Sequence, residues 1–332
     1  MAAGGSKLAV GSAIAGNFLV MCAKFIAFAV TGSAAMLSEG IHTLADVLNQ
    51  ILLMVGIVRS DKSPTEVYQY GYKSERYVWA LISAVGIFFL GCGFTLYHGI
   101  SSLFHEHHEL KGLSWAIGVL IFAFVVEVMV LIIAVRGVLK AAKGKPFFKY
   151  LRKEADPAVA AVVLEDAAAC IGVLIAMAAI ILTQITHNHI WDAVGSIAIG
   201  ILLGLIAIWL IKRNAELLVG ASIPEHLREQ VVTIIEQNPA VEEIVDLKTR
   251  ILDTETYRIK ADVRFDGEAL VDKLKDQLKP AYEKIETYEQ FEAFAREFGD
   301  DVVELLADEI DNIERKIKQQ VPQAEHMDIE AE

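Results

Sequence analysis

The sequence predicts an α-helical membrane protein with a smaller C-terminal α+β domain outside the membrane. Two observations lead to this fold class. Up to about Arg213 the 332-residue chain is a series of long apolar blocks, which stop beyond that residue. The charge changes at the same place. Residues 214–332 carry 30 acidic and 14 basic side chains, whereas the whole chain has 43 acidic and 30 basic side chains and a formal net charge of −13, so the excess of acids lies in the C-terminal part. We therefore expect a transmembrane domain over residues 1–213 and a soluble domain over residues 214–332.

Six apolar segments are long enough to cross a bilayer, which takes about 20 helical residues. They lie approximately at residues 8–31, 34–58, 77–102, 113–138, 157–183 and 192–212. The connections on one side of the membrane contain thirteen lysines and arginines, and those on the other side contain only Lys111. This asymmetry predicts that both termini and the C-terminal domain are cytoplasmic. We expect a multi-pass protein, in the plasma (inner) membrane if the chain is bacterial.

The second apolar segment contains four polar residues at helical spacing: Glu39, His42, Asp46 and Asn49. On an α-helix His42 and Asp46 are one turn apart on the same face, and the other two lie on the same stripe. An ionisable group near the bilayer centre costs at least about 2.5–3.5 kcal/mol, so something must compensate for this pair. A divalent cation would do so, since neutral imidazole and carboxylate are zinc ligands. The structural alternative is a hydrogen-bonded pair between helices.

The fifth segment contains two adjacent carboxylates, Glu165 and Asp166. Neighbouring residues point about 100° apart on a helix, so at most one of them faces a given site squarely. If Asp166 faces His42 and Asp46, three metal ligands converge from two helices. Glu165 then needs a partner of its own.

Other charged residues also lie within the apolar segments. Lys24 is expected to pair with a carboxylate or to extend its ammonium to the interface. Glu127 is equally consistent with a proton carrier and with a hydrogen bond at a helix contact. These two side chains are the partners available to Glu165. Asp192 is expected to cap the sixth helix, which it begins.

Several function classes lack sequence support. There is no nucleotide-binding glycine loop and no HExxH motif, so we expect neither ATP-driven pumping nor an enzyme. No basic stripe indicates nucleic-acid binding. The three cysteines form no CxxC motif, so neither a disulfide framework nor a thiolate zinc site is indicated. The histidines after the third segment, His105, His107 and His108, are expected to be surface residues, with an external metal site as the alternative.

The soluble part shows alternating helical and strand patterns. The predicted elements are a helix of about 14 residues from Pro224, strands at Val241–Arg250 and Thr256–Phe265 joined by a turn at Asp253, helices at 268–286 and 299–319, and a strand at Ala324–Ile329. This order resembles a small ferredoxin-like domain with an additional helical segment.

These features together resemble the cation diffusion facilitator family. The shared motifs are the pair His42 and Asp46, Asp166, the block Tyr70-Gly71-Tyr72, and the order of elements in the tail. The resemblance is greatest to the branch that contains the mitochondrial zinc transporter of animals. The phrases that match this branch are Met36–Asp46, Leu81–Phe88, Tyr97-His98-Gly99 and Leu164–Ala169.

The resemblance implies a homodimer that exchanges a divalent cation for protons by alternating between inward-facing and outward-facing states. It implies export of Zn²⁺ from the cytoplasm across the lipid bilayer, with dimerisation through the C-terminal domain and no cofactor beyond the transported metal. The implied metal ligands are His42, Asp46 and Asp166, and Glu165 is a candidate for a further ligand. The alternative is a membrane-anchored metal sensor or scaffold that transports nothing, which leaves the buried acids unexplained.

One position departs from the family pattern. Most members have a histidine one turn before the aspartate of the fifth helix, and here that position is Val162. Three protein ligands plus water, or recruitment of Glu165 or Asn49, would complete the shell. With fewer imidazoles and more oxygen ligands, Mn²⁺, Fe²⁺ and Co²⁺ become alternatives to Zn²⁺.

Overall fold

A computed structural model describes residues 2–104, 113–142, 144–153, 157–253 and 256–332. The chain divides into two compact units, Met1–Val219 and Gly220–Glu332. The boundary lies beyond the expected one at residue 213. The last helix of the first unit continues through Asn214 to Val219, and Gly220 follows it with a φ of 115°. A left-handed glycine directly after a helix is a common terminator, because it lacks the Cβ that would clash there.

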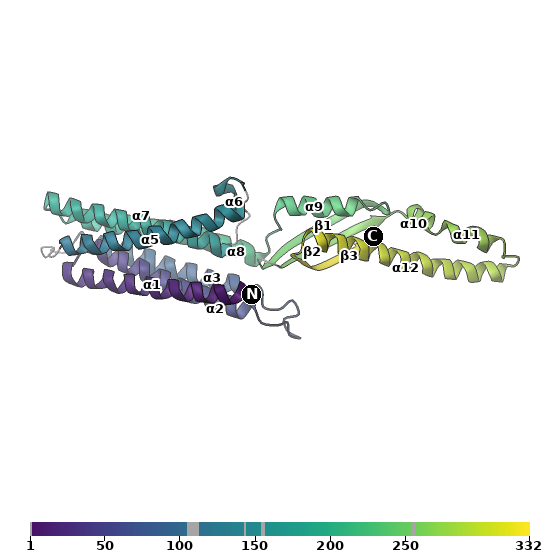
Figure 1. The fold of residues 1–332 in the computed structure, drawn as a ribbon, viewed down its shortest axis with the longest axis horizontal. Helices are drawn as coiled ribbons and strands as arrows, with labels where there is room; N and C mark the ends of the chain where they lie inside the picture. The colour runs from purple at the N-terminus through teal and green to yellow at the C-terminus, as the bar shows by residue number, and fades with distance from the viewer. Residues whose placement is uncertain (1, 105–112, 143, 154–156, 254–255) are drawn as a thin grey trace. The chain divides into compact units, whose positions relative to one another are not determined.

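The first unit is helical (Figure 1). Its helices are α1 (Ala2–Thr31), α2 (Ala34–Ser60), α3 (Glu75–Gly86), the π-helical η1 (Ile87–Phe94), α4 (Thr95–Ser102), α5 (Leu113–Ala142), α6 (Phe147–Lys153), α7 (Pro157–Thr186) and α8 (Ile190–Val219). The segments α3, η1 and α4 run on from one another without an intervening loop. The short helix α6 lies in the basic connection 136–153, where we predicted no element.

Within the described residues, five helices are long and apolar enough to cross a membrane. They span Ala34–Ser60, Glu75–Ser102, Trp115–Ala142, Val162–Thr186 and Ile190–Val219. A shorter apolar segment, Gly16–Thr31, forms part of α1. Large apolar side chains are exposed on the outside of the unit, as at Leu19, Phe89 and Ile133. Such an apolar exterior is expected of helices that face lipid.

The helices of the first unit approach closely at small residues. Ala27, Ala35, Ala176 and Ala179 are buried in its largest apolar cluster. A side-chain carbon at Gly195 of α8 would overlap that of Ala179 on α7. Small residues at helix contacts let helix backbones come together in a membrane, where lipid is as apolar as leucine. The polar residues of α2 are consequently held by tight packing on several sides.

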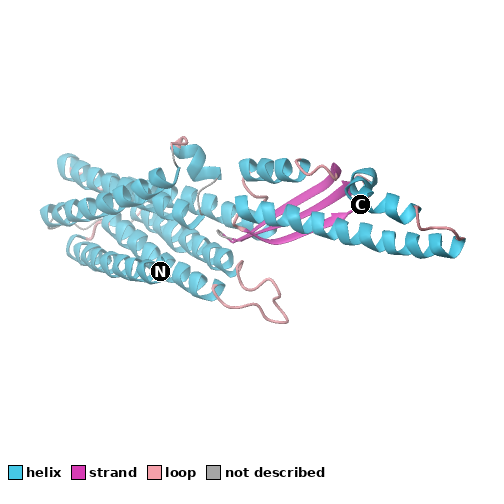
Figure 2. Cartoon of the chain, turned by 45° about the vertical axis from the view of Figure 1, so that its right-hand side comes forward, coloured by secondary structure: helices cyan, strands magenta, loops and turns pink. Residues whose placement is uncertain are grey.

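In the described part of the second unit, helices combine with one sheet of three strands in the order β1-β2-β3 (Figure 2). Its elements are α9 (Glu225–Glu236), β1 (Val241–Asp253), β2 (Thr256–Phe265), α10 (Gly267–Lys273), α11 (Lys275–Tyr282), α12 (Tyr288–Gln320) and β3 (Ala324–Ala331). Strands β1 and β2 pair antiparallel, and β3 joins β2 in parallel. The core contains Val231 and Ile235 of α9, Ile259 of β2, and Ile313 and Ile317 of α12.

The predicted strands and the helix after Pro224 are present, but α12 begins well before the expected residue 299. Thr287 and Gln290 form a capping box at its start. The Thr287 hydroxyl accepts from the Gln290 amide, and the Gln290 side chain accepts from the Thr287 amide. These bonds satisfy two amide groups at the helix start, so the helix starts there although its first turns bury little apolar surface.

Candidate functional site

The start of α2 is fixed by a residue from another helix. Gly32 makes the turn after α1 with a φ of 70°, and Ser33 is the N-cap of α2. Asp192 of α8 accepts hydrogen bonds from the Ser33 hydroxyl and from the backbone amides of Ala34 and Ala35. We predicted that Asp192 caps its own helix; instead it binds the free amide groups at the start of α2.

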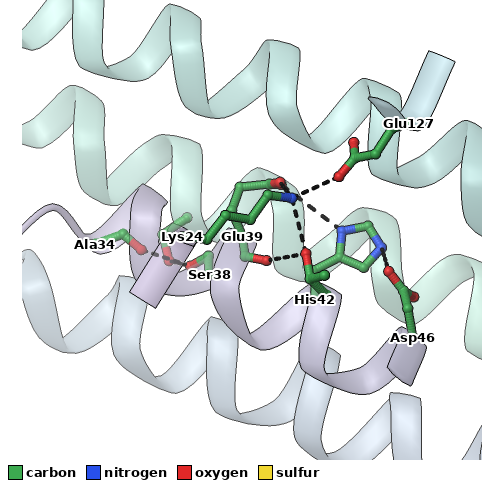
Figure 3. Close-up of polar contacts among 9 residues, drawn as sticks. Lys24, Ala34, Ser38, Glu39, His42, Asp46 and Glu127 are labelled. Carbon is green, nitrogen blue, oxygen red and sulfur yellow. Dashed lines mark hydrogen bonds and ion pairs between the residues drawn. The ribbon is translucent and has the colours of Figure 1, made fainter. Parts of the chain in front are cut away.

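The polar stripe of α2 is buried in the helix bundle. Glu39, His42 and Asn49 are almost inaccessible, and the side chain of Asp46 is 15% exposed. The two imidazole nitrogens of His42 face different carboxylates of the same helix (Figure 3). His42 Nε2 is 3.7 Å from Asp46 Oδ2, and His42 Nδ1 is 3.9 Å from Glu39 Oε1. The helical spacing of the sequence therefore places these side chains side by side, as predicted.

Lys24 of α1 is fully buried and contacts two acids (Figure 3). Its Nζ is 2.9 Å from Glu39 Oε2 on α2 and 2.8 Å from Glu127 Oε1 on α5. It also donates to Thr43 Oγ1 at 3.0 Å. Of the two roles predicted for Lys24, pairing with a carboxylate is confirmed. Glu39 was not predicted as its partner, although a lysine and a glutamate in consecutive apolar segments were a signal for such a pair.

Asn49 joins the stripe to two further helices. Its side-chain amide donates to Glu165 of α7, and its carbonyl accepts from the Ser83 hydroxyl of α3 at 2.5 Å. The expected partners of Glu165 were Lys24 and Glu127, and that prediction is wrong. Lys24 already contacts three oxygens, of Glu39, Thr43 and Glu127, and Glu165 accepts from the Asn49 amide instead.

Asp166 lies next to Glu165 on α7, a helix that packs against α2. Its Oδ2 is buried without a hydrogen-bond partner among the described residues, as are Glu165 Oε1 and His42 Nδ1. Such unsatisfied atoms are costly and rare in native proteins, and they are typical of sites that bind a ligand. Within the same part of the chain, no group of three or more His, Cys, Asp or Glu side chains is arranged to hold a metal ion.

The predicted ligand set therefore stays a prediction. The structure brings His42 and Asp46 together on α2, places Asp166 on α7, which packs against α2, and pairs Glu165 with Asn49. Moving these carboxylates toward one another without a cation would bring like charges together at a cost. Val162 is partly buried one turn before Asp166 and offers no donor atom. His105, His107 and His108 lie outside the described residues.

Apolar helices of membrane-spanning length that surround a buried, charged stripe are typical of membrane transporters. Ionisable residues in the interior of such bundles mark the pathways of ions and protons in transporters. Residues 11–219 match the family described as the cation efflux transmembrane domain. The chain belongs to this family, so the predicted resemblance is confirmed. It is a family of transporters and not of enzymes.

Relatives in animals and plants match almost the whole chain. The mitochondrial proton-coupled zinc antiporter SLC30A9 of Mus musculus is 38% identical over 314 residues, which cover 92% of this chain and 55% of that protein. Its counterpart in Homo sapiens is 37% identical over the same shares. Metal tolerance protein C4 of Arabidopsis thaliana is 34% identical over 340 residues, covering 98% of this chain and 73% of that protein. The chain thus spans about half the length of the animal relatives.

These names correct the predicted location. We predicted the plasma (inner) membrane if the chain is bacterial, whereas the animal relatives are named as mitochondrial proteins. That prediction was wrong because charge asymmetry in the connections indicates orientation and contains no information about which membrane receives the protein.

Proposed function

We propose that this chain is a proton-coupled antiporter that moves Zn²⁺ across the membrane in which it resides. The observation that supports this most is that the buried stripe of α2 and Asp166 of α7 both contain buried polar atoms without a hydrogen-bond partner among the described residues. The animal relatives are named as proton-coupled zinc antiporters, and this activity fits the same residues. Mn²⁺, Fe²⁺ and Co²⁺ are the alternative substrates, because only one imidazole is present in the ligand set.

In this proposal His42, Asp46 and Asp166 bind the cation, and Glu165 joins them when it leaves Asn49. The carboxylates supply the negative charge that makes dehydration of a divalent ion tolerable inside the bundle. Metal ligands must be deprotonated to bind, so metal entering the site displaces protons and metal leaving it allows them to return. This exchange couples the two fluxes without a further cofactor.

We infer six membrane spans, with α1 as the first, because its segment Gly16–Thr31 is apolar and helical. We also infer that the second unit is ferredoxin-like and forms a homodimer, and that the transmembrane unit alternates between two orientations of access. The sheet order and the packing of α9 and α12 against the sheet support the ferredoxin-like assignment.

Zinc uptake into proteoliposomes with a pH gradient tests the proposal. We expect saturable uptake that requires the gradient, and uptake at the background level in Asp46→Ala and in Asp166→Ala. Asp61→Ala is a matched control, because Asp61 is an exposed acid at the C-terminal end of α2. Recovery of each variant from the membrane fraction shows that insertion is intact.

Two results would contradict this proposal. Full zinc flux in both site variants would remove the site assignment. Zinc binding by the unaltered chain without any gradient-dependent uptake would favour the metal sensor or scaffold instead.

A further inference from the structure

His42 lies between two carboxylates of its own helix, and only one of them is in the proposed ligand set. Nε2 faces Asp46, while Nδ1 faces Glu39 Oε1 at 3.9 Å. Among the described residues, both Nδ1 and Glu39 Oε1 are buried with no hydrogen-bond partner. A neutral imidazole has one N–H and one lone pair, so the group opposite each nitrogen decides which of them can bind metal.

Glu39 is held in place from its other oxygen. Lys24 Nζ contacts Glu39 Oε2 at 2.9 Å, and both side chains are fully buried. The same ammonium is bound by Glu127 and Thr43. Lys24 thus fixes one oxygen of Glu39 and leaves the other directed at His42 (Figure 3). The positive charge of Lys24 also stabilises the Glu39 carboxylate, which would otherwise be an unpaired charge inside the bundle.

Helix α7 leaves space for this arrangement. Gly172 lies opposite Glu39, and a side-chain carbon at this position would overlap Glu39 Oε1. The same carbon would lie 3.4 Å from His42 Nδ1. The absence of a side chain at position 172 is therefore what allows the carboxylate to lie beside the imidazole.

We propose that Glu39, held by Lys24, is a positioning residue for His42. Glu39 Oε1 accepts a hydrogen bond from the protonated Nδ1 of His42, which leaves the lone pair of Nε2 directed toward Asp46 and the transported cation. Closing the 3.9 Å separation to a hydrogen bond of about 2.7–3.2 Å needs only a small movement of the imidazole. Carboxylates that orient metal-binding histidines in this way usually lie outside the ligand shell itself. This inference rests on the proposed function.

Zinc affinity of the purified full-length chain in detergent, measured against a competing chelator, gives the first test. Glu39→Gln and Glu127→Gln each remove one carboxylate charge from Lys24, but only Glu39 reaches His42. We expect Glu39→Gln to raise the Kd by about 10–100-fold, and Glu127→Gln to raise it much less. Gly172→Ala should also raise the Kd, although it changes no charge. Equal effects of the two glutamine variants, with none from Gly172→Ala, would overturn the positioning role.

The protonated nitrogen of His42 gives a second readout that does not depend on metal. We propose ¹⁵N NMR of histidine-labelled protein without metal, at a pH where the imidazole is neutral, with His42 assigned from a His42→Gln sample. In the unaltered chain the proton of the neutral His42 imidazole should be on Nδ1. In the Glu39→Gln variant, His42 should be a mixture of both tautomers. A proton on Nε2 in the unaltered chain would overturn the inference. Failure of that chain to bind Zn²⁺ would instead contradict the proposed function, and the tautomer would still test Glu39.

Discussion

At the scale of single residues, Val162 has the greatest consequence for metal choice. It lies one helical turn before Asp166, so the two side chains share a face of α7. A valine offers no donor atom there, and the proposed shell therefore contains one imidazole and two or three carboxylates. Carboxylate oxygens suit Mn²⁺ better than they suit softer ions, whereas imidazole suits zinc.

Val162→His should therefore favour Zn²⁺ over Mn²⁺. We expect the ratio of their inhibition constants in a transport-competition assay to shift toward zinc on the order of tenfold, or about 1.4 kcal/mol. Val162→Leu is the control, because it changes the shape of the side chain without adding a donor. An unchanged ratio in the histidine variant would show that this position does not face the cation.

At the scale of elements, the start of α2 depends on Asp192 of α8. This buried carboxylate accepts from the hydroxyl of Ser33 and from two backbone amides, so it joins helices that are far apart in the sequence. The stripe begins only a turn later with Glu39. Loosening the helix start should therefore affect stability first and the geometry of the stripe second.

Asp192→Ala should destabilise the transmembrane unit by about 1.5–3 kcal/mol, the usual range for hydrogen bonds to a charged group. Denaturant unfolding in detergent measures this change. In the control Thr186→Ala, an exposed hydroxyl loses a bond to the Leu182 carbonyl of its own helix, and the change should stay within about 0.5 kcal/mol. Equal losses in the two variants would contradict the role of Asp192.

Features that depend on local sequence could be predicted, and contacts between helices could not. The apolar segments and the strands of the second unit were predictable, because length and periodicity are local properties. The stripe of α2 was predictable for the same reason. The partners of Glu165 and Asp192 were not, since they depend on which helices pack together. The extension of α8 to Val219 was missed because the amphipathic stretch after Arg213 is no longer purely apolar.

At the scale of the whole molecule, the second unit has a core of its own. Val231, Ile259, Ile313 and Ile317 are fully buried within Gly220–Glu332. This unit should therefore fold when expressed alone. We expect cooperative urea unfolding by circular dichroism, with Ile313→Ala costing about 2–5 kcal/mol through the cavity that it leaves.

Val303→Ala is the matched control for that measurement, because Val303 lies on the same helix and is 67% exposed. Its effect should be within about 0.5 kcal/mol. A gradual, non-cooperative transition of the isolated unit would contradict the independence of its core.

In the function that we propose, His42, Asp46 and Asp166 bind one cation between α2 and α7. An anomalous-scattering map of the zinc-loaded protein, collected on both sides of the zinc absorption edge, tests it most directly. We expect one peak with the His42 nitrogen and the two aspartate oxygens at about 2.0–2.2 Å. A zinc peak in the bundle that contacts none of these three side chains would contradict the account.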